Sequence, residues 1–502
     1  MFVLGVTAVL ILCIVAFLIW WQKSARLYWE KNGVSYIPGP PLIGIPKDCM
    51  MLKKNCGELF MEIYNNEKFK DEPITGVYFF NKPSLVVRHP ELIKKILIKD
   101  FSNFMDRTLS GDPYHDVIGM DNLFLVKGQR WKTIRHKLSP IFTTGKVKNF
   151  FLLMMEVIKI LEQKLAEEIG DEPQEYDAKE LASLYTTDTL SLCAFGVQAN
   201  SLLDPKADIH ENIKRAIDFN WQRGLVYLLS FFLPKLSSVF GLILFSKETN
   251  DFLRSTINNV MEERIKSGIK RNDLIDTLIA MNKEDSDLYK GDTLVAQAAI
   301  FLAAGYETSS SAISFALYEL AQNPEVQEKL RQEINSYIEK YGSVQYETIH
   351  EMEYLHYVVQ ETLRLYPNLT FLDRNCTPTD GKSSYSLEPY HKFAIPRGMP
   401  VYIPAMAIQR DPNYFPDPLK FIPERFESKS SLHQSNFLSF GIGPRECIGK
   451  RFAYFQVKLS LVTILRHYKV EASERTPKTI KLDRKAVVLR SEEPLYINLS
   501  RI

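Results

Sequence analysis

Hydrophobic positions follow two patterns along the chain, and the first is a pair of short apolar runs near its beginning. Residues 74–80, ITGVYFF, and 84–90, SLVVRHP, flank the turn residues 81–83, Asn-Lys-Pro. Two such runs around a short turn predict a β-hairpin. Pro90 is a favourable first residue for a helix, so we expect one to start there.

The second pattern is helical and covers most of the chain. From about 130 to 370 the apolar spacing has a helical period, with polar breaks near 171–176 and 266–273. A few strands are expected again near Phe393–Ile403 and at Leu495–Leu499. The predicted fold class is therefore mainly α with small β-sheets.

The longest helical pattern runs from Asp292, a good N-cap residue, to Asn323, where Pro324 ends it. Its first two turns and its later turns are apolar on nearly every face. A helix with this pattern is buried on all sides.

The centre of this helix, AAGYETSSS at 303–311, is polar. Serine and threonine can bond back to carbonyls of their own helix, which is a purely structural explanation for residues 308–311. Glu307 needs another explanation, because burying an unpaired carboxylate is costly. A cavity, water or a cation is therefore expected beside it, and the helix is predicted to border a polar pocket.

The N-terminus differs from the rest in composition. Residues 1–21 carry no charge and are long enough to span a bilayer as a helix, while Lys23 and Arg26 follow them. Charges on this side predict an uncleaved anchor with the following chain in the cytosol. A secretory signal peptide is the alternative, although a basic start and a clear cleavage site are missing. Three Asn-x-Ser/Thr triplets would suit secretion, at Asn368, Asn375 and Asn498.

Composition favours one large domain behind this segment. The chain has 502 residues, of which 45% are hydrophobic and 24% charged, and its net charge of +2 gives no reason to expect nucleic acid as a partner. Residues 22–44 form a basic and proline-rich connector, and no linker divides 45–502.

The cysteines show no pairing pattern, and one of them, Cys447, is a candidate for a reactive thiol. Six cysteines are spread without CxxC spacing, which gives no zinc or iron-sulfur motif and suits a reducing compartment. Cys447 precedes an apolar helical run and lies beside Arg445, and both neighbours favour a thiolate. An inert buried cysteine is the alternative. A phosphate loop does not fit, because Pro444 lacks the N–H that a phosphate cradle uses.

The segment around Cys447 resembles the haem-binding signature of cytochromes P450, since all five fixed positions are filled by Phe440, Gly443, Arg445, Cys447 and Gly449. The resemblance implies the cytochrome P450 fold and heme b, with the Cys447 thiolate as the proximal ligand of the iron. Arg445 would pair with a haem propionate, and Phe440 would border the cofactor.

Other motifs of the family can be found at matching positions. Glu361 and Arg364 in ETLRLYP resemble its ExxR pair, and Arg425 in PERF resembles the arginine that completes it. The resemblance implies a buried structural triad, whereas an isolated pair of this kind is usually a solvated surface pair.

Further positions are implied to lie near the cofactor. Trp131 and Arg135 in WKTIR resemble the WxxxR pair that contacts a propionate. Arg374 resembles an arginine near the haem, and Arg107 in FMDR is a weaker match of the same kind. Gln409 stands where many relatives have histidine, at a position that is not catalytic.

AGYETS matches the distal-helix pattern of the family. The resemblance implies that Thr308 hydrogen-bonds the reacting oxygen and that Glu307 helps to relay protons into an otherwise dry site. Gly305 would leave space where a ligand approaches. Ile300 and Ala304 lie two turns and one turn before Thr308, so they are candidate substrate contacts.

The resemblance implies a function as well. It covers Pro38 to about Arg490 and is strongest to the microsomal clan of broad-specificity xenobiotic and steroid oxidases. It implies a monooxygenase that inserts one atom of O2 into a lipophilic small molecule, with electrons from NADPH through NADPH-cytochrome P450 reductase and with cytochrome b5 as a further partner. The location implied is the endoplasmic reticulum membrane, with the catalytic domain facing the cytosol. A P450-fold isomerase or dehydratase and a haem-binding sensor are the alternatives.

Two surface features belong to this interpretation. The apolar segment Leu225–Phe245 is interrupted by Pro234, so two short pieces are expected, either over the substrate entrance and in contact with the bilayer or as a buried hairpin. A basic cluster would dock the acidic reductase, and it consists of Lys127, Arg130, Lys132, Lys137, Lys146 and Lys148.

Overall fold

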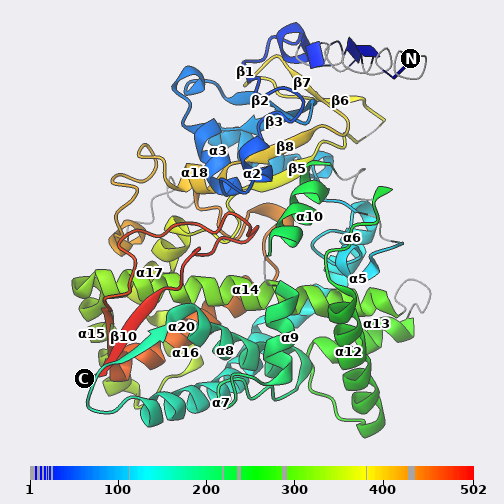
Figure 1. Cartoon of the computed structure of the whole chain (residues 1–502). Coiled ribbons are helices and arrows are strands. Elements are labelled where there is room, and N and C mark those ends of the chain that lie inside the picture. Colours follow the sequence, from blue (N-terminus) through cyan, green and yellow to red (C-terminus); the bar gives the residue numbers. More distant parts are fainter. Residues whose placement is uncertain are drawn as a thin grey trace.

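The computed structural model of the chain is mainly helical, as predicted (Figure 1). It describes residues 6–502 apart from 8–11, 14–15, 18–19, 21, 24–26, 112–113, 218–219, 234–238, 285–290, 380 and 428–435. The described helices are α2 (Lys47–Met50), α3 (Cys56–Tyr64), α4 (Pro90–Lys94), α5 (Val117–Met120), α6 (Gly128–Leu138), α7 (Thr144–Glu168), α8 (Ala178–Leu190), α9 (Asp208–Ile217), α10 (Trp221–Phe232), α12 (Lys247–Ser267), α13 (Leu274–Glu284), α14 (Asp292–Gln322), α15 (Pro324–Tyr341), α16 (Tyr346–Glu351), α17 (Glu353–Leu365), α18 (Ala405–Gln409) and α20 (Lys450–His467).

The strands form small sheets, the largest of which is the layer at the top of Figure 1. Its order is β1-β2-β3-β8-β5, and the other described sheets are β4-β10-β9 and β6-β7. The strand bounds are β1 (Tyr36–Ile37), β2 (Ile74–Phe79), β3 (Lys82–Val87), β4 (Gln174–Asp177), β5 (Leu372–Asn375), β6 (Ser384–Ser386), β7 (Ala394–Pro396), β8 (Pro400–Ile403), β9 (Tyr468–Ala472) and β10 (Tyr496–Arg501).

The predicted hairpin is confirmed, but its turn is displaced. β2 pairs antiparallel with β3, and the turn consists of Phe80 and Asn81, which have φ values of 51° and 61°. Two left-handed residues match the right-handed twist of the flanking strands. Pro83 therefore lies inside β3, opposite Tyr78, rather than in the turn. The helix expected at Pro90 does begin there.

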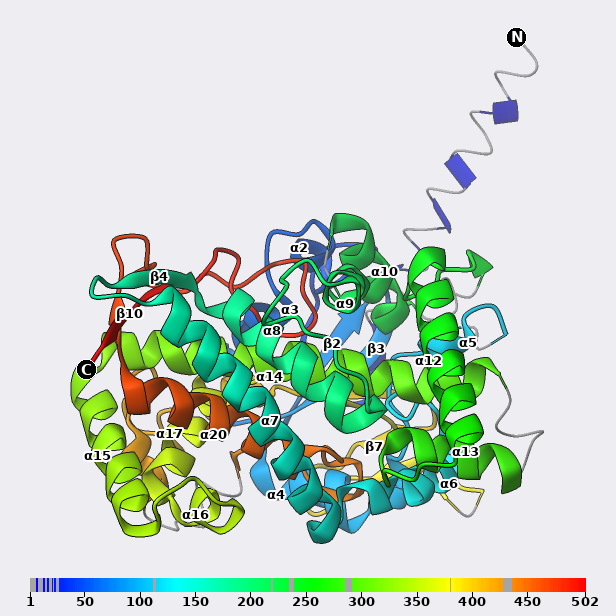
Figure 2. The same ribbon diagram turned by 90° about the horizontal axis from the view of Figure 1, so that it is seen from below.

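The long central helix is α14, and it crosses the middle of the molecule (Figures 1 and 2). Helices α8, α17 and α20 pack against it, and Figure 1 shows α7 and α8 below it. Asp292 is the first helical residue rather than the N-cap, which is Gly291. The Asp292 carboxylate instead accepts from Arg254, with Nε 2.7 Å from Oδ1. Asn323 is the C-cap, as predicted.

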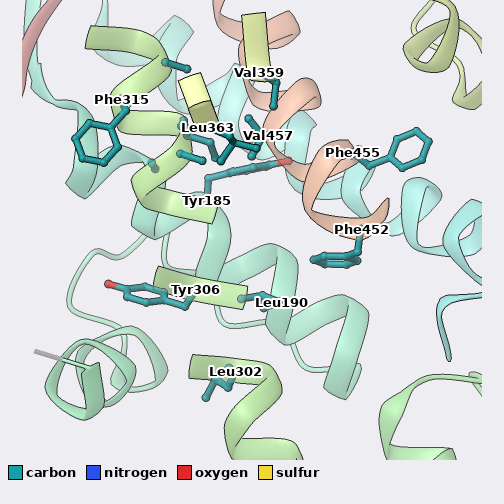
Figure 3. Close-up of a cluster of buried hydrophobic side chains, with 14 of the residues drawn as sticks. Tyr185, Leu190, Leu302, Tyr306, Phe315, Val359, Leu363, Phe452, Phe455 and Val457 are labelled. Carbon is teal, nitrogen blue, oxygen red and sulfur yellow. The ribbon is translucent and has the colours of Figure 1, made fainter. Parts of the chain in front are cut away.

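The main core surrounds α14 and joins it to the helices that carry the motifs. Figure 3 shows side chains of four helices in one cluster: Tyr185 and Leu190 of α8, Leu302, Tyr306 and Phe315 of α14, Val359 and Leu363 of α17, and Phe452, Phe455 and Val457 of α20. Close packing of this kind fixes the four helices relative to one another.

Gly305 serves this packing and not the approach of a ligand, so the sequence-based interpretation was wrong. A Cβ atom on Gly305 would lie 2.6 Å from Cδ2 of Leu190 on α8. The missing side chain therefore lets α14 and α8 approach closely.

The predicted anchor, residues 1–21, lies mostly outside the described residues. Among the residues that the structure does describe, no helix is long and apolar enough to cross a membrane. The segment 225–245 contributes the end of α10, which closes at Phe232, and residues 234–238 are again outside the description.

Candidate active site

Cys447 lies in a tight loop that leads into α20. The loop contains the short turn Gly443–Arg445, and the Cys447 N–H donates to the carbonyl of Phe440 at 2.9 Å. Gly443 has φ 77°, and a Cβ atom there would lie 2.1 Å from the carbonyl oxygen of Leu97. A side chain at Gly443 would therefore push the loop out of place.

The Cys447 thiol faces an enclosed space. Its side chain is exposed, and yet burial raises the pKa of the thiol. These two properties occur together when a side chain is surrounded by protein but opens into an internal cavity. The loop thus presents the sulfur to a space inside the protein.

The expectation that Arg445 and the helix make this thiol acidic was wrong in direction. Burial outweighs the opposing effects of the Gly449 N–H and of Arg135, so the pKa is raised. Arg445 does not face the thiol, because its Nη2 donates to the carbonyl of Val126 at 2.8 Å. A coordinated metal ion deprotonates a thiol whatever its resting pKa, so a metal partner would supply the thiolate.

Arg445 instead belongs to a group of buried arginines, together with Arg107 and Arg374. Burial lowers the pKa of Arg445 to about 8 and that of Arg374 to about 9, with further lowering by neighbouring guanidinium groups. The Nη1 atom of Arg107 lies 3.2 Å from Oδ1 of Asp373. Among the described residues, Nε of Arg374 and Nε of Arg107 have no hydrogen-bond partner.

This arginine cluster lacks enough negative charge. Buried charges are retained only when they are paired. Within the described part of the chain, two guanidinium nitrogens here have no partner, and the cluster has one ion pair, Arg107 with Asp373, so a further anion is expected to bind. A planar carboxylate would satisfy such forks.

Helix α6 places Trp131 and Arg135 beside this cluster. The buried Trp131 ring lies 4.2 Å from the guanidinium carbon of Arg445. Burial lowers the pKa of Arg135, and the largest effect in the opposite direction is the electrostatic interaction with Cys447. The i, i+4 spacing thus puts one residue against the arginine cluster and the other near the thiol.

Helix α14 also borders an internal space. Ala304 is exposed although it lies in the middle of the buried helix, and Thr308 is partly accessible. The Thr308 hydroxyl donates to the carbonyl of Ala304 at 2.6 Å. A cavity is lined by Thr308 of α14, Leu363 of α17, and Phe440 of the cysteine loop. The structure therefore brings the polar centre of α14 and the Cys447 loop to one internal space, although Thr308 and Phe440 are 132 positions apart in the sequence.

Glu307 has a cation beside it, which is one of the three alternatives expected from the sequence, and this cation is Lys179. The side chain is buried, and its Oε2 lies 3.2 Å from Nζ of Lys179 on α8. The same Nζ lies 2.6 Å from Oγ of Ser310 and 2.9 Å from Oγ of Ser311. The explanation that the hydroxyls of residues 308–311 bond back to carbonyls of their own helix therefore fails for Ser311, whose partners are the Lys179 and Glu307 side chains.

Comparison with known proteins agrees with this geometry. The family model of cytochrome P450 matches residues 38–499. Similar proteins include probable cytochrome P450 6g2 of Drosophila melanogaster, 41% identical and covering 94% of each chain, and probable cytochrome P450 6w1 of the same species, 39% identical over 96% of this chain and 95% of the relative. Cytochrome P450 6j1 of Blattella germanica is 36% identical over 94% of this chain and 93% of the relative. The chain belongs to the cytochrome P450 family.

As a P450, the chain is a haem-thiolate monooxygenase that inserts one atom of O2 into a lipophilic small molecule. Its cofactor is heme b, and NADPH supplies electrons through a flavoprotein reductase. The residues present fit this cofactor. The orphaned arginine atoms suit propionate carboxylates, and a thiol that opens into an internal space suits an axial ligand.

The ExxR motif of this P450 is buried and complete. Nε of Arg364 lies 2.6 Å from Oε2 of Glu361, and Nε of Arg425 lies 3.1 Å from Oε1 of the same carboxylate. Both members of the first pair are fully buried, so this is not a surface pair. The triad joins α17 to the turn Pro423–Phe426, as the resemblance implies.

Gln409 has a structural role that the sequence did not reveal. Its Oε1 accepts from the N–H of Leu438 at 2.6 Å, and its Nε2 donates to the carbonyls of Leu363 and Arg364. The side chain thus ties the start of the cysteine loop to the end of α17. No sequence pattern announces such a contact, because the partners are backbone atoms.

Proposed function

We propose that Cys447 would bind the haem iron as a thiolate and that Arg374, Arg445, Trp131 and Arg135 would hold the propionate groups. The arrangement around one internal space carries this proposal, because Thr308 of α14 and Phe440 of the cysteine loop line the same cavity. When bound, the haem supplies the activation of dioxygen and the transfer of one oxygen atom. Phe440 borders the cofactor from the cysteine side.

On α14, Thr308 and Glu307 deliver the protons that the reaction consumes. The Thr308 hydroxyl holds its proton on the Ala304 carbonyl and can turn toward the cavity. Glu307 supplies a titratable group one residue away, and the buried surroundings exclude bulk water. Ile300 and Ala304 lie along the same face and contact the substrate. The retained alcohol favours a monooxygenase over a P450-fold isomerase.

Thr308→Ala is expected to lower the amount of product formed per NADPH several-fold. Among the residues that the structure describes, the hydroxyl donates only to its own helix, so its loss removes proton handling while the fold is preserved. The measurement compares NADPH consumption with product in the reconstituted system. Thr308→Ser keeps the hydroxyl and should restore coupling, whereas tight coupling in the alanine variant would refute the role.

Electrons enter through the basic side of α6. Lys132 is exposed there, while Lys137 pairs with Glu284 and Lys148 with Glu347. We propose that this face docks NADPH-cytochrome P450 reductase, with cytochrome b5 as a second partner on the same face.

Lys132→Glu combined with Lys137→Glu is expected to slow reduction by reductase, and to slow it more at low salt. Lys132 should account for most of the effect, because Lys137 is already neutralised by its glutamate. Stopped-flow reduction checks this. Lys206→Glu, an exposed lysine outside the cluster, is the control, and identical rates for both variants would count against the docking face.

Residues 1–21 are proposed to anchor the protein in the endoplasmic reticulum membrane, behind the connector 22–44, so that the catalytic domain 45–502 faces the cytosol. Their uncharged composition supports this proposal. Val239 and Phe240 are 79% and 66% exposed, which fits contact with lipid and the entry of lipophilic substrates from the bilayer.

A further inference from the structure

Lys179 enters the polar centre of α14 from a neighbouring helix. It belongs to the first turn of α8, where Asp177 is the N-cap. The ammonium contacts the Glu307 carboxylate and the hydroxyls of Ser310 and Ser311. The Lys179 side chain remains 25% exposed, whereas the Glu307 side chain is 4% exposed.

The local position of Lys179 is unfavourable for a cation. The N-terminal turn of a helix carries a partial positive charge, and Lys179 lies in that turn. Burial lowers the pKa of its ammonium, and Arg490 acts in the same direction. Asp177 opposes this lowering, and the Tyr306 ring lies 5.9 Å away. Glu307 is the strongest of the stabilising charges, so the lysine is held there by its contact with the acid.

The ion pair with Lys179 also fixes the direction of the Glu307 carboxylate. Consecutive residues of a helix project about 100° apart, so Glu307 and Thr308 leave α14 on different faces. Lys179 and Ser311 hold the carboxylate on the face toward α8, while Thr308 borders the cavity. Lys179 is the accessible member of this cluster and Glu307 the enclosed one.

We propose that Lys179 is a positioning residue for proton delivery, which holds the Glu307 carboxylate toward α8 and passes protons from its accessible side to that carboxylate. In each transfer an N–H bond of the ammonium breaks and an O–H bond of the Glu307 acid forms, and a hydronium ion of the solvent then returns a proton to the amine and becomes water. No electrons change hands. This inference rests on the proposed function of Glu307 and adds the residue from which it receives protons.

The test uses the full-length protein reconstituted with reductase. Lys179→Met removes the charge and keeps the aliphatic stem, whereas Lys179→Arg keeps a cation and its donors. Product per NADPH should fall several-fold in the methionine variant and recover only partly in the arginine variant, because arginine can hold the carboxylate in place but does not give up a proton. The solvent deuterium isotope effect on product formation should rise in the methionine variant, a change that a purely structural role would not produce. Lys164→Met, which breaks the Lys164–Glu168 ion pair on α7, is the matched control.

A second measurement does not depend on activity. Thermal unfolding of Lys179→Met, Glu307→Gln and the double variant forms a mutant cycle. Each single variant should lower the Tm, and the double variant should lower it by less than the sum. Additive shifts in the Tm would overturn this inference alone. So would a folded Lys179→Met protein with the product per NADPH and the solvent isotope effect of an active wild type. A wild type that forms no product would overturn the proposed function together with it.

Discussion

Cys447→Ser is expected to lower monooxygenase turnover by more than about 100-fold, because even the residues behind a metal ligand typically account for about 10–100-fold in affinity or activity. Serine preserves the size of the side chain and the loop hydrogen bond from the Cys447 N–H. The thiolate that donates electron density to the iron is lost. Product formation per folded protein is the measurement, with folding followed by circular dichroism.

Cys56→Ser provides the control for this substitution. Cys56 is half-buried at the start of α3, outside the internal space that Cys447 faces. This variant should keep the turnover of the wild type. Comparable losses in both variants would show that serine acts through the fold, and full activity in Cys447→Ser would remove Cys447 from the site.

Glu361→Gln is expected to destabilise the protein by about 3–5 kcal/mol, the usual effect of removing one partner from a buried ion pair. Glutamine keeps the shape of the side chain but leaves Arg364 and Arg425 without their counter-charge. Because the triad fixes α17 beside the cysteine loop, haem retention should fall as well. Urea unfolding and the ratio of haem to protein measure the two effects.

The control is another glutamate with a cation three residues later. Glu91 pairs with Lys94 at 2.7 Å on the surface of the protein. Exposed pairs contribute little, so Glu91→Gln should unfold at the same urea concentration as the wild type. A Glu361→Gln protein that matches this control would show that the buried triad is not what stabilises the region.

The sequence predicted most of the elements because their patterns are local. The hairpin, the helix start at Pro90 and the limits of α14 follow from spacing and turn chemistry, with errors of one or two residues at Asn81 and Asp292. The Cys447 loop and the ExxR triad were found because fixed spacings mark them.

What the sequence missed depends on contacts between distant segments. Lys179 meets Glu307 across 128 positions, and Gln409 meets backbone atoms of two other segments. The packing of Gly305 against Leu190 was missed for the same reason. The raised pKa of Cys447 reflects burial in the folded protein, which no neighbour in the sequence reveals.

The central claim is that Cys447 ligates haem iron as a thiolate in this P450. The most direct test is the absorption spectrum of the purified wild-type protein, reduced and exposed to carbon monoxide. We expect the red-shifted band of thiolate-ligated haem in the wild type and its absence in Cys447→Ser. A wild-type band at the position of histidine-ligated haem proteins, or a red-shifted band that survives in Cys447→Ser, would contradict it.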